Sequence, residues 1–357
     1  MRIRNLVNLS ALEKTYSIAF AVILLLTQMS SSHASNVPNG SCPTLGKTAT
    51  IAGVKFICAK SGKKQIWSKI PSTPAISDID KKLEVISDAV KLKMKSATSV
   101  VDLSLNVDPL LTNSQWSKDS IASIPSALKL LSALGVRPVN QMKIYISWGS
   151  GYKNQFTPAY CQFPSGGGLC GQTGIIFADL KWFADSWGYD GVEAPYKWEM
   201  DEFTIKANLP HEIGHYGQEE SAAGIGNTDY WKYDPGWLRE GVAEYFKLLS
   251  SAYDRNVSYK KLHDMYLKNS GSQRCVKYSL LDMSSENFNS DGCEYSKGLY
   301  AAELLVSKTG RAESIFDMER TIGTDTASIF KKAYGFSLES FCKEVDAYFA
   351  QITANQK

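Results

Sequence analysis

The stretch Asn208–Gln218, NLPHEIGHYGQ, carries two histidines four residues apart. Four residues of a helix turn through about 400°, so His211 and His215 would project from one face, one turn apart. Two imidazoles in this arrangement can reach one zinc ion about 2.0 to 2.1 Å from each nitrogen. Glu212 follows the first histidine, where its carboxylate can contact a water molecule at the ion without being a ligand. The stretch therefore predicts a helix that supplies part of a zinc site.

A zinc site needs a third protein ligand and an open fourth position. Three downstream residues are candidates: Glu240, Asp229 and His263. Glu240 is the favoured one, because Glu240 and Glu244 repeat the four-residue spacing and so share a helix face, one to ligate and one to orient. Their helix is otherwise apolar, and buried carboxylates need partners. The alternative is a solvated stripe of glutamates.

The motif HEIGH, followed by WLREGVAEY, resembles the gluzincin branch of zinc peptidases, and especially the bacterial MA-like peptidase domains related to thermolysin and aminopeptidase N. The resemblance covers about residues 209–351. It implies a zincin-like metallopeptidase domain that binds Zn²⁺. The residues it implies are the zinc ligands His211, His215 and Glu240, the general base Glu212, and an orienting carboxylate at Glu244.

Two features depart from that family. The 24 residues between His215 and Glu240 are more than in aminopeptidase N-type enzymes, a difference that a surface loop can absorb. Pro210 stands immediately before His211, at a point through which relatives continue their helix. Proline in a helix interior costs about 3 kcal/mol. We therefore expect the helix to begin near Asn208 or to kink there.

The reaction implied is hydrolysis of a peptide bond by metal-activated water, with a peptide or protein as substrate. Glu212 would take the proton of the water and pass it to the leaving amine. The resemblance suggests a tyrosine, on the helix after the ligand helix, as donor to the developing oxyanion. We choose Tyr295 over Tyr300 for this role. An extended substrate could pair with a predicted strand at Gly174–Ala178 by β-addition.

Two other functions stay open. One is a cell-envelope binding protein in which a peptidase-like scaffold survives and residues 35–72 bind a partner. The other is a zinc hydrolase that acts on a non-peptide amide such as a wall cross-link. The presence of all the catalytic residue types favours the endopeptidase.

The first 34 residues have the pattern of a secretory signal peptide, with a basic start, the apolar run Ile18–Thr27 and the small-residue cleavage site Ser32–Ala34. The apolar run is shorter than the roughly 20 residues that span a bilayer. We expect cleavage before Ser35, a secreted or periplasmic, cell-envelope location, and no stable membrane span in the mature chain.

The composition and net charge of the chain limit the kinds of partner that we expect it to bind. The chain has 357 residues, of which 44% are apolar and 21% charged, as in an ordinary globular protein. Removal of residues 1–34 takes away three basic residues and one acidic residue, so the formal charge falls from +3 to +1. A nearly neutral protein gives no electrostatic reason to expect binding to nucleic acid or to an anionic membrane.

Seven cysteines lie after the predicted signal peptide, in a compartment where disulfides form. Their spacing suggests three local pairs: Cys42 with Cys58, Cys161 with Cys170, and Cys275 with Cys293. Cys342 is left over, and its place in an apolar helical pattern predicts a buried thiol.

The organisation predicted is α+β. Residues 35–72 form a small disulfide-stapled β-hairpin module and linker, with Trp67 covering one face; its lysines could bind an anionic cell-envelope polymer, or simply form a solvated turn. Residues 73–357 form the metallopeptidase-like domain. It should begin with a helix at 77–95 capped by Ser77, continue with strands at 99–105 and 142–147 around a helix at 121–134, and have a mostly helical C-terminal half.

Overall fold

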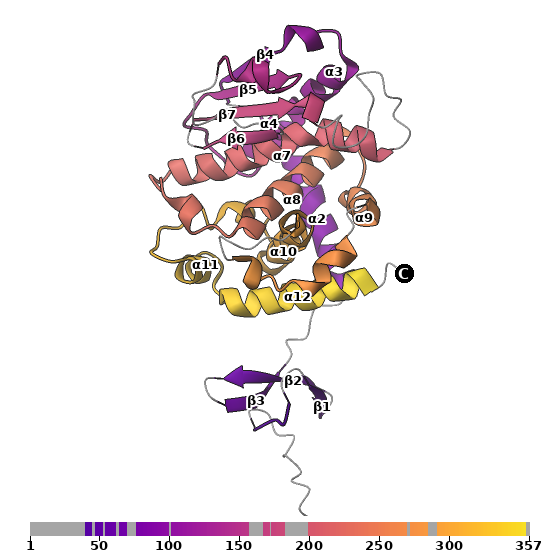
Figure 1. Ribbon diagram of the computed structural model, residues 1–357, viewed down its shortest axis with the longest axis vertical. Helices are drawn as coiled ribbons and strands as arrows, with labels where there is room; N and C mark the ends of the chain where they lie inside the picture. Colours follow the sequence, from indigo (N-terminus) through magenta and orange to yellow (C-terminus); the bar gives the residue numbers. More distant parts are fainter. Residues whose placement is uncertain are drawn as a thin grey trace, which may run out of the picture. The chain divides into compact units, whose positions relative to one another are not determined.

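A computed structural model, shown in Figure 1, divides the chain into two units, Met1–Ser72 and Thr73–Lys357. The structure describes residues 40–44, 47–52, 54–61, 64–69, 76–99, 101–156, 167–171, 173–182, 199–269, 272–284 and 291–354. The predicted signal peptide and the segment 70–75 lie outside the described residues.

The N-terminal unit is an antiparallel sheet with the strand order β1-β2-β3, formed by β1 (Thr48–Ile51), β2 (Val54–Ser61) and β3 (Lys64–Lys69). A disulfide joins Cys42 to Cys58, as predicted. Phe56 and Trp67 pack with these two cysteines to form the core of the unit. So small a core has few apolar side chains, which is the situation in which a disulfide adds most to stability.

The second unit begins with a mixed sheet, whose described strands have the order β4-β5-β7-β6. Strands β4, β5 and β7 are parallel, and β6 is antiparallel to β7. Nearly every side chain of β5 and β7 is buried, as expected for central strands of a parallel sheet. The strands are β4 (Leu103–Val107), β5 (Met142–Ser147), β6 (Gly167–Cys170) and β7 (Ile175–Asp179).

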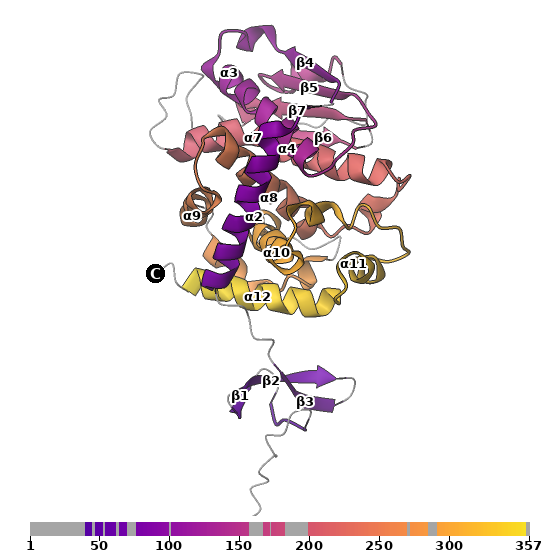
Figure 2. The same cartoon turned by 180° about the vertical axis from the view of Figure 1, so that it is seen from behind.

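The sheet lies at one end of the unit, and helices make up most of the rest of it (Figures 1 and 2). Helix α7 packs against β6 and β7 on one side and against α8 on the other. The α-helices are α2 (Ile76–Ser96), α3 (Gln115–Ala122), α4 (Ile124–Ala133), α5 (Ser150–Lys153), α7 (Glu199–Ala223), α8 (Gly236–Asp254), α9 (Tyr259–Asn269), α10 (Cys293–Thr309), α11 (Thr326–Tyr334) and α12 (Leu338–Ala354). Short 3₁₀ turns are η1 (Pro109–Leu111), η3 (Tyr230–Lys232), η4 (Ser272–Lys277), η5 (Asp282–Ser284) and η6 (Ala312–Phe316).

Helix α8 packs closely against α7 and α10, and glycines lie at both points of contact. A Cβ added to Gly214 on α7 would lie 3.0 Å from the Cα of Ala243. On the other side, a Cβ added to Gly241 would lie 2.1 Å from the carbonyl oxygen of Gly298 on α10. The contact at Gly241 leaves no room for a side chain, and the one at Gly214 leaves very little. The glycines therefore set the spacing of α7, α8 and α10.

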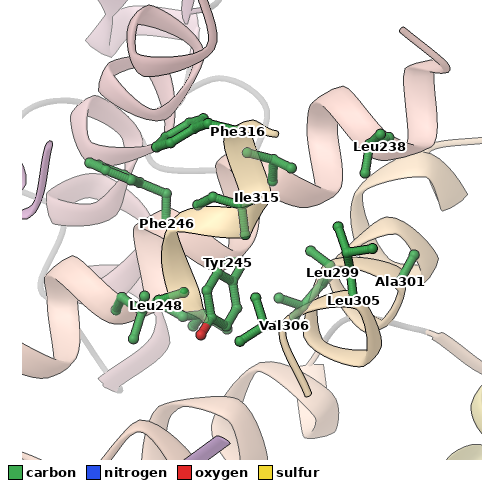
Figure 3. Close-up of a cluster of buried hydrophobic side chains, with 14 of the residues drawn as sticks. Leu238, Tyr245, Phe246, Leu248, Leu299, Ala301, Leu305, Val306, Ile315 and Phe316 are labelled. Carbon is green, nitrogen blue, oxygen red and sulfur yellow. The ribbon is translucent and has the colours of Figure 1, made fainter. Parts of the chain in front are cut away.

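The core around this crossing is apolar. Figure 3 shows part of it, with side chains from α8, α10 and η6 gathered between the helices. Tyr245, Phe246, Val306 and Phe316 are each fully buried. Burial of a large apolar side chain contributes roughly 1.5 to 3 kcal/mol, so this cluster holds α8 firmly in place.

The structure confirms the predicted α+β class and the mostly helical C-terminal half. A disulfide joins Cys275 to Cys293, and Cys342 is a fully buried free thiol, both as predicted. Burial raises the pKa of Cys342 to about 12, so it is an inert thiol. The predicted pair of Cys161 with Cys170 stays a prediction, because Cys161 lies outside the described residues.

Two local expectations were wrong, and a third was wrong in part. Of the two outcomes expected at Pro210, a helix start near Asn208 is ruled out, because α7 runs through the proline; packing on both of its sides outweighs the cost of that residue. A kink at Pro210 stays a prediction. Helix α2 already begins at Ile76, so Ser77 is not its N-cap. Residues 175–178 of the segment 174–178 lie in β7, which is paired on both edges, so this strand cannot accept a further strand.

Within the described part of the chain, no helix combines the length and the apolar character that crossing a membrane requires.

The close crossing of α8 and α10 predicts the effect of Gly241→Ala. The added methyl group would overlap a backbone carbonyl that cannot rotate away. We expect the free energy of unfolding in urea, at a fixed zinc concentration, to fall by about 3 kcal/mol, at the upper end of the usual overpacking cost. The matched control is Gly151→Ala on α5, where a Cβ meets nothing within 4 Å and the change should stay within about 1 kcal/mol. Equal stability of the two variants would contradict the account.

Candidate metal centre

Helices α7 and α8 bring three ligand atoms together. Nε2 of His211 lies 3.1 Å from Nε2 of His215, as the four-residue spacing on α7 predicts. Oε2 of Glu240, on α8, lies 3.3 Å from the first of these atoms and 3.2 Å from the second. The three atoms form a nearly equilateral triangle, and His211, His215 and Glu240 are a group that could hold a metal ion.

The size of this triangle fits a tetrahedral zinc ion. With ligand atoms about 2.0 to 2.1 Å from the ion, neighbouring ligands of a tetrahedron lie about 3.3 Å apart. The observed sides of 3.1 to 3.3 Å match this value. One carboxylate and two imidazoles are also a donor set that zinc accepts in catalytic sites, where three protein ligands leave a fourth position open. The residues present therefore fit the ion.

Glu244 lies next to His211. Its Oε1 lies 2.9 Å from Nδ1 of His211, on the side of the ring away from Glu240, and it accepts a hydrogen bond from Nζ of Lys247 at 2.7 Å. Burial alone would raise the pKa of Glu244, but Lys247 and His211 lower it to about 2. Glu244 is buried and Glu240 nearly so, which rules out a solvated stripe of glutamates.

Glu212 is buried beside the triangle. Burial raises the pKa of its carboxyl, and the neighbouring histidines oppose that shift. A Cβ added to Gly167, on strand β6, would lie 2.9 Å from Oε1 of Glu212. The carboxyl group therefore lies against the backbone of β6 at Gly167.

The two candidate tyrosines lie in different surroundings. The ring of Tyr295, at the start of α10, is 5.8 Å from the ring of His211, and the residue is 41% exposed. Burial of the hydroxyl and the carboxylates of Glu240 and Glu212 raise the pKa of Tyr295 above its usual range. Tyr300 is fully buried and packs edge-on against His263. Of the two, Tyr295 is the one beside the histidine pair.

The other two candidates for a third ligand lie elsewhere. Asp229 has an exposed side chain that pairs with Lys232 at 2.8 Å. His263 is buried on α9, with its Nε2 3.4 Å from Oε2 of Glu303. The group around the two histidines of α7 includes Glu240 alone of the three.

A pocket and a contact at this site were not predicted from the sequence. A pocket of about 380 Å³ adjoins Glu240 and is lined also by Trp231, Arg239 and Glu294. The segment before α8, the start of α8, η5, the start of α10 and the start of α11 line it together. These segments are far apart in sequence, so no local pattern predicts that they meet. The contact is between Gln218 and His215, whose Oε1 and Nδ1 atoms are 2.9 Å apart. Their three-residue spacing on a helix was the available signal.

Comparisons of the chain with models of protein families, with curated proteins and with solved structures find no match. The class that the fold and the site define is therefore an α+β protein with a candidate His-His-Glu metal site of the HExxH-plus-Glu pattern.

The triangle predicts which substitutions abolish zinc binding. Glu240→Ala removes one of its three corners, and we expect the purified variant to lose most of its zinc. Asp229→Ala is the matched control, since its carboxylate pairs with Lys232 on the surface, and it should keep about one zinc per chain. Metal analysis after gel filtration measures both. Loss of zinc from the Asp229 variant with retention in the Glu240 variant would reverse the assignment.

Zinc and a proton should compete for His211. In the metal-free protein, burial lowers the pKa of His211, but its contacts with Glu240 and Glu244 overcome this effect and raise the pKa to about 10. Only the unprotonated nitrogen binds zinc, so binding at pH 7.5 must release about one proton from this residue, and affinity should rise with pH up to about 10. Calorimetry in buffers of different ionisation enthalpy counts the released protons. Zinc binding without proton release would contradict this electrostatic description.

Proposed function

We propose that the chain is an exported, zinc-dependent endopeptidase. The observation that carries the proposal is the triangle of ligand atoms from His211, His215 and Glu240, with the carboxyl group of Glu212 beside it. The resemblance of the two motifs to the gluzincin peptidases supports the same assignment.

A zinc ion held by these ligands would supply a Lewis acid that activates a water molecule and polarises the carbonyl group to be cleaved. Glu212 acts as the general base: it takes a proton from the attacking water and gives it to the leaving amine. Its burial supports this role, because a raised pKa brings a carboxylate closer to the operating pH. No covalent bond to the protein forms.

Tyr295 donates a hydrogen bond to the oxygen that develops negative charge during the attack. Its position at the start of α10, near the ring of His211, supports this role. Tyr295 is 41% exposed, so a substrate can reach part of the residue.

An extended peptide binds along strand β6. Among the described residues this strand pairs only with β7, so its other edge can accept a peptide by β-addition. The contact between Gly167 and Glu212 would bring such a peptide to the general base. The pocket beside Glu240 falls within the size range of roughly 300 to 1,000 Å³ for small-ligand sites and has room for a substrate side chain.

Export is part of the proposal. The disulfides Cys42–Cys58 and Cys275–Cys293 indicate an extracytoplasmic protein, because such bonds persist in oxidising compartments. The predicted signal peptide at residues 1–34 gives the route. The substrate is then a protein or peptide outside the cytoplasm.

Substitution of the general base tests the proposed reaction. Glu212→Gln keeps the size of the side chain but removes its ability to take a proton, so cleavage of an unstructured protein such as casein should fall about 10²- to 10⁴-fold while zinc stays bound. The matched control is Glu339→Gln, an exposed residue on α12, which should cleave like the wild type. A Glu212→Gln variant that cleaves at the wild-type rate would contradict the proposal, as would a zinc-loaded wild type with no peptidase activity.

A further inference from the structure

A line of polar contacts runs from His215 into the protein interior. Nδ1 of His215 lies 2.9 Å from Oε1 of Gln218, and Nε2 of Gln218 donates a hydrogen bond to Oε1 of Glu319 at 2.8 Å. Gln218 and Glu319 are each 1% exposed. They are separated by 101 residues in sequence, so the contact joins α7 to the segment that follows η6.

The order of donors and acceptors along this line fixes the tautomer of His215. An amide accepts at its oxygen and donates at its nitrogen. Since the nitrogen of Gln218 faces an oxygen of Glu319, the amide oxygen faces Nδ1 of His215. Nδ1 then carries the hydrogen, and Nε2 keeps the lone pair that it needs to bind a metal.

Glu319 is itself held in place. Its backbone carbonyl accepts a hydrogen bond from Nδ2 of Asn227, just beyond the end of α7, at 3.2 Å. Burial, with a further contribution from Asp234, raises the pKa of the Glu319 carboxyl well above its usual range. A proton taken up on Oε2 leaves Oε1 free to accept from Gln218, so the order of donors and acceptors holds in either state.

The Nδ1 atoms of the two histidines thus contact different groups. His211 meets the carboxylate of Glu244, whereas His215 meets an amide that a buried carboxyl group orients. A buried amide costs free energy unless it is hydrogen-bonded, and an apolar side chain would fill the same space without partners. The hydrogen-bonded pair of Gln218 and Glu319 is therefore best explained by its contact with His215, a candidate metal ligand.

We propose that Gln218 and Glu319 are positioning residues that hold His215 in the tautomer and orientation required for zinc. The inference rests on the proposed metal centre, to which it adds a contribution from the C-terminal part of the chain. Partners of this kind typically change metal affinity 10- to 100-fold.

Zinc affinity, measured by competition with a chelator, tests the proposal. Gln218→Met keeps the length of the side chain but removes the acceptor, so the dissociation constant should rise 10- to 100-fold. The surface substitution Gln115→Met is the matched control and should leave the constant unchanged. Glu319→Met should weaken zinc binding, and Glu319→Gln should restore most of it, because its amide oxygen still accepts from Gln218. The absorption spectrum of the cobalt-substituted protein should change in the Gln218→Met and Glu319→Met variants only.

The experiment distinguishes failure of the proposed function from failure of this inference. A wild type that binds no zinc would refute the proposed function, whereas a wild type and a folded Gln218→Met variant of equal affinity and spectrum would refute this inference alone. A lower melting temperature of the metal-free variant, without a change in zinc affinity, would show a purely structural role and also refute it. If Gln218→Met does not fold, the comparison of Glu319→Met with Glu319→Gln decides: equal affinity of those two variants refutes the inference.

Discussion

The close packing of α8 between α7 and α10 is the constraint on which the site depends. Gly214 lies within the HEIGH motif itself and lets α7 approach Ala243, while Gly241 follows Glu240 directly and touches Gly298. Because these contacts are at the backbone, they fix the distance between helix axes rather than between flexible side chains. The ligand atoms of α7 lie 3.2 to 3.3 Å from that of α8 for that reason.

Burial of the site between these helices determines how its charged groups behave. Two imidazoles and several carboxylates are removed from water around one point, which is costly unless the charges are compensated. Burial would raise the pKa of Glu240, but the two histidines hold it well below the usual range. A divalent cation would provide that compensation in place of the proton on His211. The apolar cluster around Tyr245 and Phe246 keeps the arrangement rigid (Figure 3).

The sequence predicted those parts of the site that depend on one helix or on a short motif. The pairing of His211 with His215 follows from four-residue spacing, and the apolar neighbours of Glu240 distinguished it from Asp229. Strand order could not be read in this way: the pattern of the segment 174–178 indicated a buried strand but not that β6 would cover its edge. Tertiary packing also decided the course of α7 through Pro210, against the local preference of that residue.

The contact of Gln218 with Glu319 shows most clearly what could not be predicted from the sequence. Nothing in either segment reveals it, because the two residues meet only through the packing of the C-terminal part of the chain on α7. Diffraction data collected at the zinc absorption edge, from crystals of the purified protein, would test the central claim most directly. We expect one anomalous peak about 2.0 to 2.2 Å from Nε2 of His211, Nε2 of His215 and an oxygen of Glu240. A zinc-loaded crystal with no peak there, or with its peak held by other residues, would contradict it.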